Sequence, residues 1–193
     1  MGINFTPPTQ EYCHIQAARQ TELARAIVPM LNIVYKPKSI IEFGCGCGAF
    51  LQIFADTAGT DEFMGLDGSD YGDNLIIQKH KFRQVDFQKS NDIPKKYDIV
   101  VCLEIAEHLP KSHADIFIAN LTMHAGTCVI FSAAIPGQGG DGHVNEQPHF
   151  YWHKKFTARG FTTRDNIRSI IAKNKKIPFW YRENIFCYER TSG

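Results

Sequence analysis

A short apolar run that ends in alternating glycines is the feature that most constrains the fold. Residues 39–43 (SIIEF) have the composition of a buried strand, and Gly44, Gly46 and Gly48 follow before a helical segment that begins at Ala49. Glycines at alternate positions let the backbone approach a ligand closely, because no Cβ stands in the way. In an open α/β sheet, ligands bind beyond the carboxyl ends of the strands. The glycine turn therefore predicts a ligand site, and it also fits the dinucleotide pattern G-x-G-x-x-A.

The rest of the chain alternates between strand-like and helix-like segments. Further strands are predicted over residues 63–66, 82–85, 98–103, 127–133, 161–164 and 184–190. After an extended arm over residues 1–11, helices are predicted over residues 12–33, 49–56, 73–78, 111–123, 148–159 and 166–173. Such alternation implies an α/β fold whose sheet is mostly parallel and covered by helices on both faces. The last strand is expected to be antiparallel, at one edge of a seven-stranded sheet.

A single domain in three parts accounts for the whole chain. The expected parts are an N-terminal arm and helix (1–35), a cofactor-binding core (39–133) and a substrate-side C-terminal part (134–193).

Composition and charge indicate an ordinary globular domain. The chain has 193 residues, of which 44% are hydrophobic and 21% charged, and its formal net charge is +1. A charge so close to zero creates no global field toward nucleic acid or an acidic membrane. The six cysteines show no zinc-knuckle spacing, so we interpret them as reduced thiols of a cytoplasmic protein. No apolar run reaches the ~18 residues of a membrane span, and the N-terminus does not resemble a signal peptide.

Two aspartates each close a predicted strand. Asp67 ends the strand at 63–66, about 20 residues beyond the glycine turn, where a carboxylate can accept hydrogen bonds from both hydroxyls of a ribose. Asp86 ends the strand at 82–85 and is suited to accept a hydrogen bond from an adenine amino group, with Phe87 packed on the ring. Each aspartate also fits a simpler role in a solvated turn.

Together with the segment Asp98–Pro110 (DIVVCLEIAEHLP), these features resemble the class I S-adenosylmethionine (SAM)-dependent methyltransferase superfamily. The resemblance covers residues 39–164 in order and spacing, and it implies a Rossmann-like fold that binds SAM. The three glycines would then line the methionine and ribose, and the two strand-end aspartates would hold ribose and adenine. Glu42 would orient the glycine turn and reach the methionine amino group through water. Leu103 and Glu104 would lie beside the methionine moiety.

The segment Glu104-Ile-Ala-Glu107-His108 suggests a metal ion. Glu104 and Glu107 are three residues apart, so one helical turn would put both carboxylates on one face, beside His108. Two carboxylates and an imidazole can hold Mg²⁺ or Mn²⁺. The segment resembles the metal-binding stretch of small-RNA 2′-O-methyltransferases and of ubiquinone-pathway O-methyltransferases. There a metal would hold two neighbouring substrate oxygens and lower the pKa of the attacked hydroxyl. Many members of the superfamily carry E-x-x-E-H with no metal established, so a purely structural role also fits.

A glycine-rich segment at residues 135–147 (IPGQGGDGHVNEQ), called here the long loop, leaves the carboxyl end of the predicted strand at 127–133. Its glycines allow a close approach to substrate, and its polar side chains are not needed for packing. We predict His143 as general base or fourth metal ligand, because histidine titrates near neutral pH. His108 is the second predicted catalytic residue. A solvated loop without chemistry is the alternative.

The predicted reaction is methyl transfer from SAM to a small polar acceptor, with a sugar or nucleotide-sugar hydroxyl favoured. The chain lacks large insertions and an RNA-binding module, which favours a small molecule as the partner. Oxygen is favoured over nitrogen because a histidine and carboxylates follow the strand at 98–103. Many N-methyltransferases carry an Asn/Asp-Pro-Pro-Tyr segment at that point.

Other functions stay open. Late basic residues interleave with aromatic ones near 178–181 (PFWY), which also fits an RNA or other nucleic-acid methyltransferase. A non-catalytic adenosyl-binding or interaction protein and an NAD-dependent oxidoreductase are further alternatives. The sequence does not fix the oligomeric state.

Overall fold

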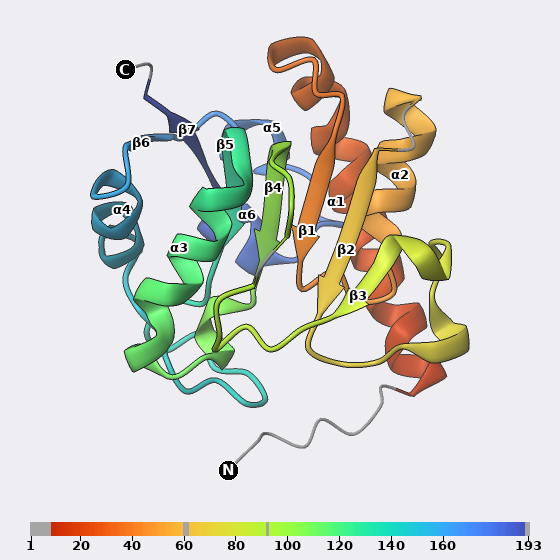
Figure 1. The fold of residues 1–193 in the computed structure, drawn as a ribbon, viewed down its shortest axis with the longest axis horizontal. Helices are drawn as coiled ribbons and strands as arrows, with labels where there is room; N and C mark the ends of the chain where they lie inside the picture. Colours follow the sequence, from red (N-terminus) through yellow and green to blue (C-terminus); the bar gives the residue numbers. More distant parts are fainter. Residues whose placement is uncertain (1–8, 60–61, 92, 192–193) are drawn as a thin grey trace.

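A computed structural model of the chain describes residues 9–59, 62–91 and 93–191 (Figure 1). Within these residues one sheet contains β1 Ile40–Phe43, β2 Phe63–Asp67, β3 Phe82–Gln84, β4 Tyr97–Leu103, β5 Ala125–Ser132, β6 Phe161–Arg164 and β7 Phe186–Arg190. The α-helices are α1 Gln10–Val34, α2 Ala49–Ala58, α3 Ala114–His124, α4 His149–Thr157, α5 Arg168–Ile171 and α6 Phe179–Asn184. Short 3₁₀ helices are η1 Gly72–Asn74, η2 Lys79–Lys81, η3 Ala106–His108 and η4 Lys111–His113.

The sheet is parallel from β3 to β5, and the strand order is β3-β2-β1-β4-β5-β7-β6. The last strand, β7, is antiparallel to both β5 and β6. The predicted seven-stranded, mostly parallel sheet with an antiparallel last strand is therefore confirmed, and β7 lies one place inside the edge strand β6. The order of strands reverses between β1 and β4, and ligands bind at such a switch point, beyond the carboxyl ends of the strands.

Helices cover both faces of the sheet, as predicted. On one face, α1, α2, α5 and α6 share a buried core that contains Leu31 and Phe50. On the other face, α3 and α4 share a core that contains Phe117 and Trp152. Figure 1 shows α3 in front of the sheet and α1 behind it. Successive residues of the buried strand β1 supply the two cores in turn, because side chains of a strand alternate between its faces.

The first helix begins earlier than predicted. The hydroxyl of Thr9 accepts a hydrogen bond from the backbone N–H of Tyr12 (3.2 Å) and so caps α1, which starts at Gln10. The end of the arm predicted over 1–11 therefore belongs to α1, while residues 1–8 lie outside the described residues.

Two other predicted elements differ from the structure. The helix predicted over 73–78 is only the short turn η1, which buries none of its side chains. The strand predicted over 184–190 starts at Phe186, because the preceding residues form α6 directly after Pro178. The correction matters for function, since α6 lines the cleft described below.

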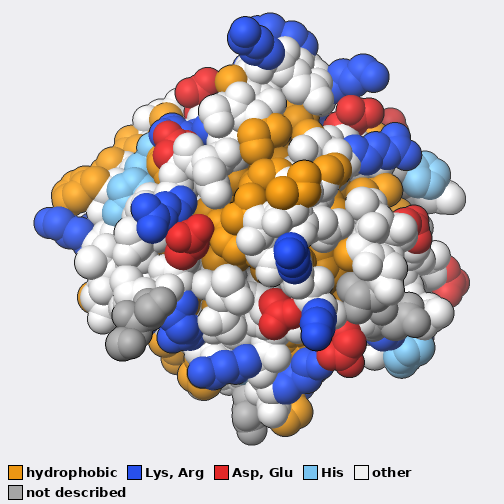
Figure 2. Space-filling model, turned by 90° about the horizontal axis from the view of Figure 1, so that it is seen from above, with side chains coloured by type: hydrophobic (Ala, Val, Ile, Leu, Met, Phe, Trp, Pro, Cys, Tyr) orange, Lys and Arg blue, Asp and Glu red, His pale blue; other side chains and the backbone are white. Residues whose placement is uncertain are grey.

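The surface carries charges of both signs. Figure 2 views the molecule from above Figure 1, and there Lys and Arg side chains are interspersed with Asp and Glu around a central group of apolar ones. No helix within the described ranges combines the length and apolarity that crossing a membrane requires. All six cysteines are buried free thiols.

Candidate functional site

A cleft of about 1180 Å³ opens at the carboxyl ends of β1, β2 and β4. Strands β1 and β2 run downward in Figure 1, so this end is at the bottom of the view, where α1 begins. The cleft is lined by the glycine turn, Asp67, residues 84–88, residues 103–105 and 107–109, part of the long loop, and residues of α1 and α6. The predicted cofactor and metal residues therefore meet in one place, with the exceptions given below.

The glycine turn passes close to the segment that follows β4. Gly44 has φ +81°, and a Cβ built on it would lie 2.1 Å from Ile105 Cδ1, so only glycine fits. Gly46 has φ +56°, and a Cβ there would make ordinary van der Waals contacts with Gln20 and Tyr71, the nearest at 3.7 Å, so the backbone conformation and not a lack of room favours glycine. Gly44 and Gly46 line the cleft, whereas Gly48, where a Cβ would lie 2.7 Å from Ile77, does not.

Asp67 is joined to the glycine turn by hydrogen bonds. Its Oδ2 accepts a bond from the backbone N–H of Gly46 (2.9 Å), and its Oδ1 accepts one from Ser69 (2.9 Å). Burial raises the pKa of Asp67, and the backbone N–H groups partly offset that rise. The carboxylate is therefore held in a fixed position at the cleft, where the predicted ribose role requires it.

The predicted adenine residues also line the cleft. The Asp86 carboxylate accepts a hydrogen bond from the backbone N–H of Gln88 (2.9 Å) and pairs with Lys89 (3.1 Å). Phe87 packs against Phe43 and Phe117, with ring centroids 5.8 and 5.6 Å away, and only 7% of it is exposed. The Phe87 ring is thus committed mainly to the core, and only a small part is left for contact with adenine.

Glu42 lies behind the glycine turn. It is 1% exposed, and Oε2 accepts no hydrogen bond from the residues that the structure describes. Burial, and then the charge of Asp67, raise its pKa well above the usual range. Glu42 does not line the cleft directly, whereas Leu103 does.

Glu104 differs from its predicted conformation. Its φ is +54°, and the 3₁₀ turn begins only at Ala106, so Glu104 and Glu107 do not share a helical turn. The cause is non-local, because the Glu104 N–H bonds Ser132 on β5, through the backbone oxygen (3.0 Å) and Oγ (3.1 Å). The Glu104 carboxylate accepts hydrogen bonds from Gln138 Nε2 (2.9 Å) and Asn184 Nδ2 (3.5 Å).

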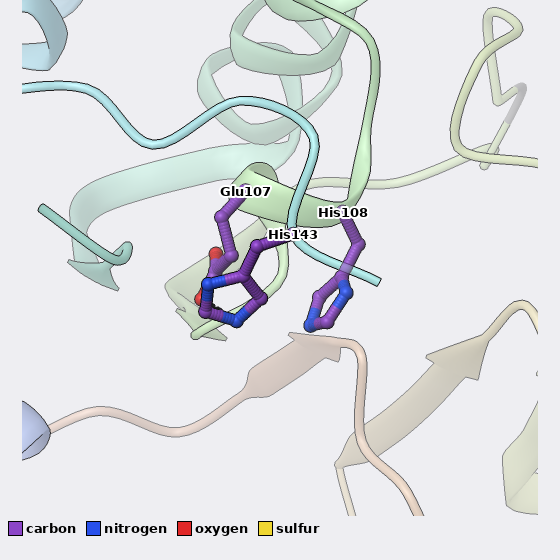
Figure 3. A group of neighbouring side chains, drawn as sticks. All are labelled: Glu107, His108 and His143. Atoms are coloured by element: carbon purple, nitrogen blue, oxygen red, sulfur yellow. Dashed lines mark ion pairs between the residues drawn. The ribbon is translucent and has the colours of Figure 1, made fainter. Parts of the chain in front are cut away.

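Three of the four predicted metal ligands come together. Glu107, His108 and His143 each offer one ligand atom, and these atoms lie within 4.8 Å of one another. Figure 3 shows the three side chains extending from η3 and the long loop into the same space. Glu104 is not part of this group.

Glu107 is the unusual member of the group. Its side chain is 0% exposed, and no described residue donates a hydrogen bond of ordinary geometry to either carboxylate oxygen. Burial and the nearby Glu104 raise its pKa well above the usual range, and nearby backbone N–H groups offset this only in part. A buried charge without a partner is costly, and a bound cation removes that cost.

The long loop aims His143 at Glu107. Backbone N–H groups of Val144 and Asn145 donate to the Glu107 carbonyl oxygen (2.9 and 3.0 Å). The Glu146 carboxylate lies 3.0 Å from His143 Nδ1 and favours a proton on that nitrogen, and in the neutral imidazole the lone pair is then on Nε2. This Nε2 lies 4.0 Å from Glu107 Oε1. Two electron-rich atoms that face each other in a buried place favour a cation between them.

His108 completes the group. Its ring centroid lies 5.0 Å from that of His143, with the two planes at 84°. Burial, and then the neighbouring His143, lower the pKa of His108, which favours the neutral imidazole that binds metals. The donor set of one carboxylate and two imidazoles fits a divalent ion.

Several residues that line the cleft were not predicted as cofactor or metal residues, although the segment 178–181 was considered for a nucleic-acid substrate. On α1 they are Tyr12, Gln16, Arg19 and Gln20, and on α6 they are Phe179, Trp180 and Tyr181. The apolar periodicity of residues 12–33 indicated a packing helix, and its polar positions were not assigned a role. A usable signal was present, since these α1 residues recur at the spacing of one helix face.

The fold and this cleft resemble those of class I SAM-dependent methyltransferases. A family model described as "Methyltransferase domain" matches residues 15–167. The chain therefore belongs to this methyltransferase-domain family.

Individual relatives are distant. The chain is similar to a ubiquinone biosynthesis O-methyltransferase of Pseudomonas fluorescens (strain SBW25), with 27% identity over 104 residues. The match covers 49% of this chain and 44% of that protein, so this chain spans less than half of the relative's length.

Solved structures share the fold over almost the whole chain. A sugar N-methyltransferase from Streptoalloteichus sp ATCC 53650 superimposes with a TM-score of 0.73 at 13% identity, covering 100% of this chain and 96% of that one. Magnesium protoporphyrin IX methyltransferase from Synechocystis PCC 6803, solved with bound S-adenosylhomocysteine (SAH), gives 0.66 at 17% identity, covering 97% and 90%.

Proposed function

We propose that this enzyme transfers the methyl group of SAM to a hydroxyl of a small polar acceptor, assisted by a divalent metal ion. The single observation that carries the proposal is the unpartnered Glu107 carboxylate beside His108 and His143. These residues line the same cleft as the glycine turn and Asp67, which are proposed to hold SAM. Acceptor and cofactor would thus meet in one cavity.

The three residues would hold Mg²⁺ or Mn²⁺. When bound, the ion supplies positive charge that lowers the pKa of an acceptor hydroxyl and fixes two neighbouring oxygens. Glu107 contributes a carboxylate oxygen, and His143 contributes Nε2, because Nδ1 is engaged by Glu146. Glu104, close to Glu107 but held by Gln138 and Asn184, stays outside the ligand set.

The chain's own part in the reaction is alignment and exclusion of water. Sulfonium methyl groups react readily with an aligned nucleophile, so orientation accounts for much of the acceleration. The glycine turn and Asp67 are proposed to fix the methyl donor, and the long loop covers the acceptor side. In the absence of an ion, His143 Nε2 is the free acceptor for the hydroxyl proton.

The proposed acceptor is a sugar or nucleotide-sugar with two neighbouring hydroxyls. A metal-held pair of oxygens suits such a diol. The similarity to a ubiquinone biosynthesis O-methyltransferase supports an oxygen acceptor, and the structural neighbour that methylates a sugar supports the sugar. We further propose a cytoplasmic location, which the six buried free thiols support.

Calorimetry combined with a transfer assay tests the proposal. Purified protein is treated with a chelator and titrated with SAH, with and without Mn²⁺ or Mg²⁺. Methyl transfer from labelled SAM is then measured to sugars, nucleotide-sugars, matched deoxy-sugars that lack one hydroxyl, and a short RNA. The expected result is metal-dependent labelling of a sugar diol and not of its deoxy analogue.

Other outcomes would overturn parts of this proposal. Methyl transfer that does not depend on a metal would contradict the role proposed for the ion. Labelling of RNA, with retention that weakens as salt rises, would favour the nucleic-acid alternative, since a terminal ribose also carries two neighbouring hydroxyls.

A further inference from the structure

The first half of α1 forms one wall of the cofactor cleft. Tyr12, Gln16, Arg19 and Gln20 all line the cavity, at spacings of four, three and one residues along a 3.6-residue helix. The helix therefore turns one polar face toward the cleft, from the half-exposed Tyr12 to the buried Gln20. The predicted packing role of this helix does not require such a face.

Gln20 is the most buried polar residue of this face. It is only 8% exposed, and its Oε1 has no hydrogen-bond partner in the described part of the chain. Its Nε2 lies 3.7 Å from the point where a Cβ on Gly46 would stand. The amide thus lies beside the glycine turn, with its oxygen unsatisfied. Buried polar groups are nearly always hydrogen-bonded, so an unpartnered oxygen on the wall of the cleft indicates a missing donor.

A second unpartnered acceptor lies behind the same turn, at the end of β1 and outside the lining of the cleft. Glu42 Oε2 is also buried without a partner among the described residues, two positions before Gly44. The glycine turn is thus flanked by two acceptors that lack donors. An ammonium group offers three N–H donors. The amino-acid end of SAM carries such an ammonium group. The ribose end is proposed to be bound separately by Asp67, whose two oxygens each accept one backbone hydrogen bond and keep acceptor capacity for the ribose hydroxyls.

We propose that Gln20 is a cofactor-binding residue whose Oε1 accepts a hydrogen bond from the α-ammonium group of SAM. The inference depends on SAM as the cofactor and not on the acceptor or the metal. It makes α1 part of the cofactor site and not only a packing helix.

Removing the two partners of this bond in turn tests the proposal, by calorimetry in the presence of a chelator. One ligand is SAH, and the other is deaminated SAH, which lacks the α-amino group. Wild-type protein is expected to bind the deaminated ligand about tenfold or more weakly, which is about 1.4 kcal/mol. Gln20→Met keeps the length of the side chain but removes the acceptor. It is expected to lower SAH affinity about tenfold while changing that of the deaminated ligand by less than about twofold.

Each other outcome overturns the inference. If Gln20→Met lowered the affinity for both ligands equally, Gln20 would only pack α1 against the glycine turn. Equal affinity of wild-type protein for both ligands would contradict the proposed contact with the ammonium group. This result does not depend on whether the variant folds. Gln20→Glu keeps an acceptor and should retain SAH affinity within about threefold. Gln10→Met, at the exposed start of α1, is the matched control and should bind both ligands as wild type does. A folded wild-type protein that bound neither ligand would instead contradict SAM as the cofactor.

Discussion

Asp67 and Glu107 both place a carboxylate at the cleft, but the protein surrounds them differently. Asp67 accepts two backbone hydrogen bonds, from Gly46 and Ser69. Glu107 accepts none of ordinary geometry from any residue within the described ranges, and it lies near a second carboxylate, Glu104. Burial raises the pKa of both, and more strongly for Glu107.

The comparison distinguishes a carboxylate whose hydrogen bonds the protein supplies, Asp67, from one that lacks them, Glu107. The chain itself satisfies the charge of Asp67, which can receive a neutral ligand such as a ribose without rearrangement. The charge of Glu107 is compensated only if something positive joins it, and His143 already presents a lone pair there. An unpaired buried carboxylate lowers the stability of the fold unless a bound cation compensates its charge. The two carboxylates should therefore respond in opposite ways to the same kind of substitution.

The largest effect is expected from Glu107→Gln. The amide keeps the shape of the side chain but removes the charge that holds a divalent ion. We expect the metal-dependent methyl-transfer rate to fall about 100-fold or more, because a bound ion contributes several kcal/mol. SAH affinity in chelator should stay within about threefold. Rates are measured against Mn²⁺ concentration.

The matched control is Glu189→Gln, because Glu189 bonds Tyr35 (2.7 Å) and Arg164 (2.9 Å) and does not line the cleft. An unchanged rate in Glu107→Gln would break the comparison, since both carboxylates would then be structural.

Asp67→Ala should act on the cofactor instead. The substitution removes the proposed ribose acceptor and leaves the Gly46 N–H unpaired. Hydrogen bonds to charged groups contribute about 1.5–3 kcal/mol, so SAH affinity should fall roughly 10- to 100-fold. Mn²⁺ affinity should not change. Asp70→Ala is the control, because the exposed Asp70 caps only its own turn at Gly72. Equal losses of affinity for SAH and for Mn²⁺ would instead indicate that the whole cleft has lost its structure.

Thermal stability in chelator should reveal the opposite signs directly. Asp67→Asn replaces a bonded carboxylate and should lower the melting temperature, whereas Glu107→Gln removes a buried carboxyl whose raised pKa costs stability at neutral pH and should raise it. A change of about 1–2 kcal/mol corresponds to roughly 2–8 °C for a chain of this size. Saturating Mn²⁺ should stabilise wild type but not Glu107→Gln, and so reverse their order. A lower melting temperature for both variants in chelator would mean that protein groups already satisfy Glu107.

These carboxylates also show what local sequence can and cannot predict. The glycine turn and Asp67 follow buried strands directly, so the strand pattern alone places them at one end of the sheet. The conformation of Glu104 could not be predicted this way. Its spacing from Glu107 indicated a helical turn, but its N–H bonds Ser132 on a neighbouring strand. A contact across 28 residues of sequence has no local signal.

Residues farther apart were harder still. His143 was proposed from the composition of the long loop, and the structure brings it to Glu107 because Val144 and Asn145 bond the Glu107 carbonyl. Gln20 was missed, because apolar periodicity finds the buried face of α1 and assigns the other face to solvent. That assignment fails where a second wall of the molecule, here the glycine turn, covers the polar face.

The smallest effect is expected from Gln138→Ala. This variant tests Glu104, a third carboxylate, which is bonded by side chains and lies near Glu107. Gln138 donates to Glu104 (2.9 Å) and accepts from Asn184 (2.7 Å), so it holds the long loop to α6. Removing it loosens the loop without removing a metal ligand, and turnover should fall only about three- to fivefold, or roughly 1 kcal/mol. Metal affinity, measured by Mn²⁺ titration, should stay within about threefold. Gln147→Ala is the control, because the Gln147 amide bonds only Asn145 within the loop (3.0 Å). A loss of metal affinity as large as that of Glu107→Gln would show that Glu104 needs Gln138 to act as a fourth ligand.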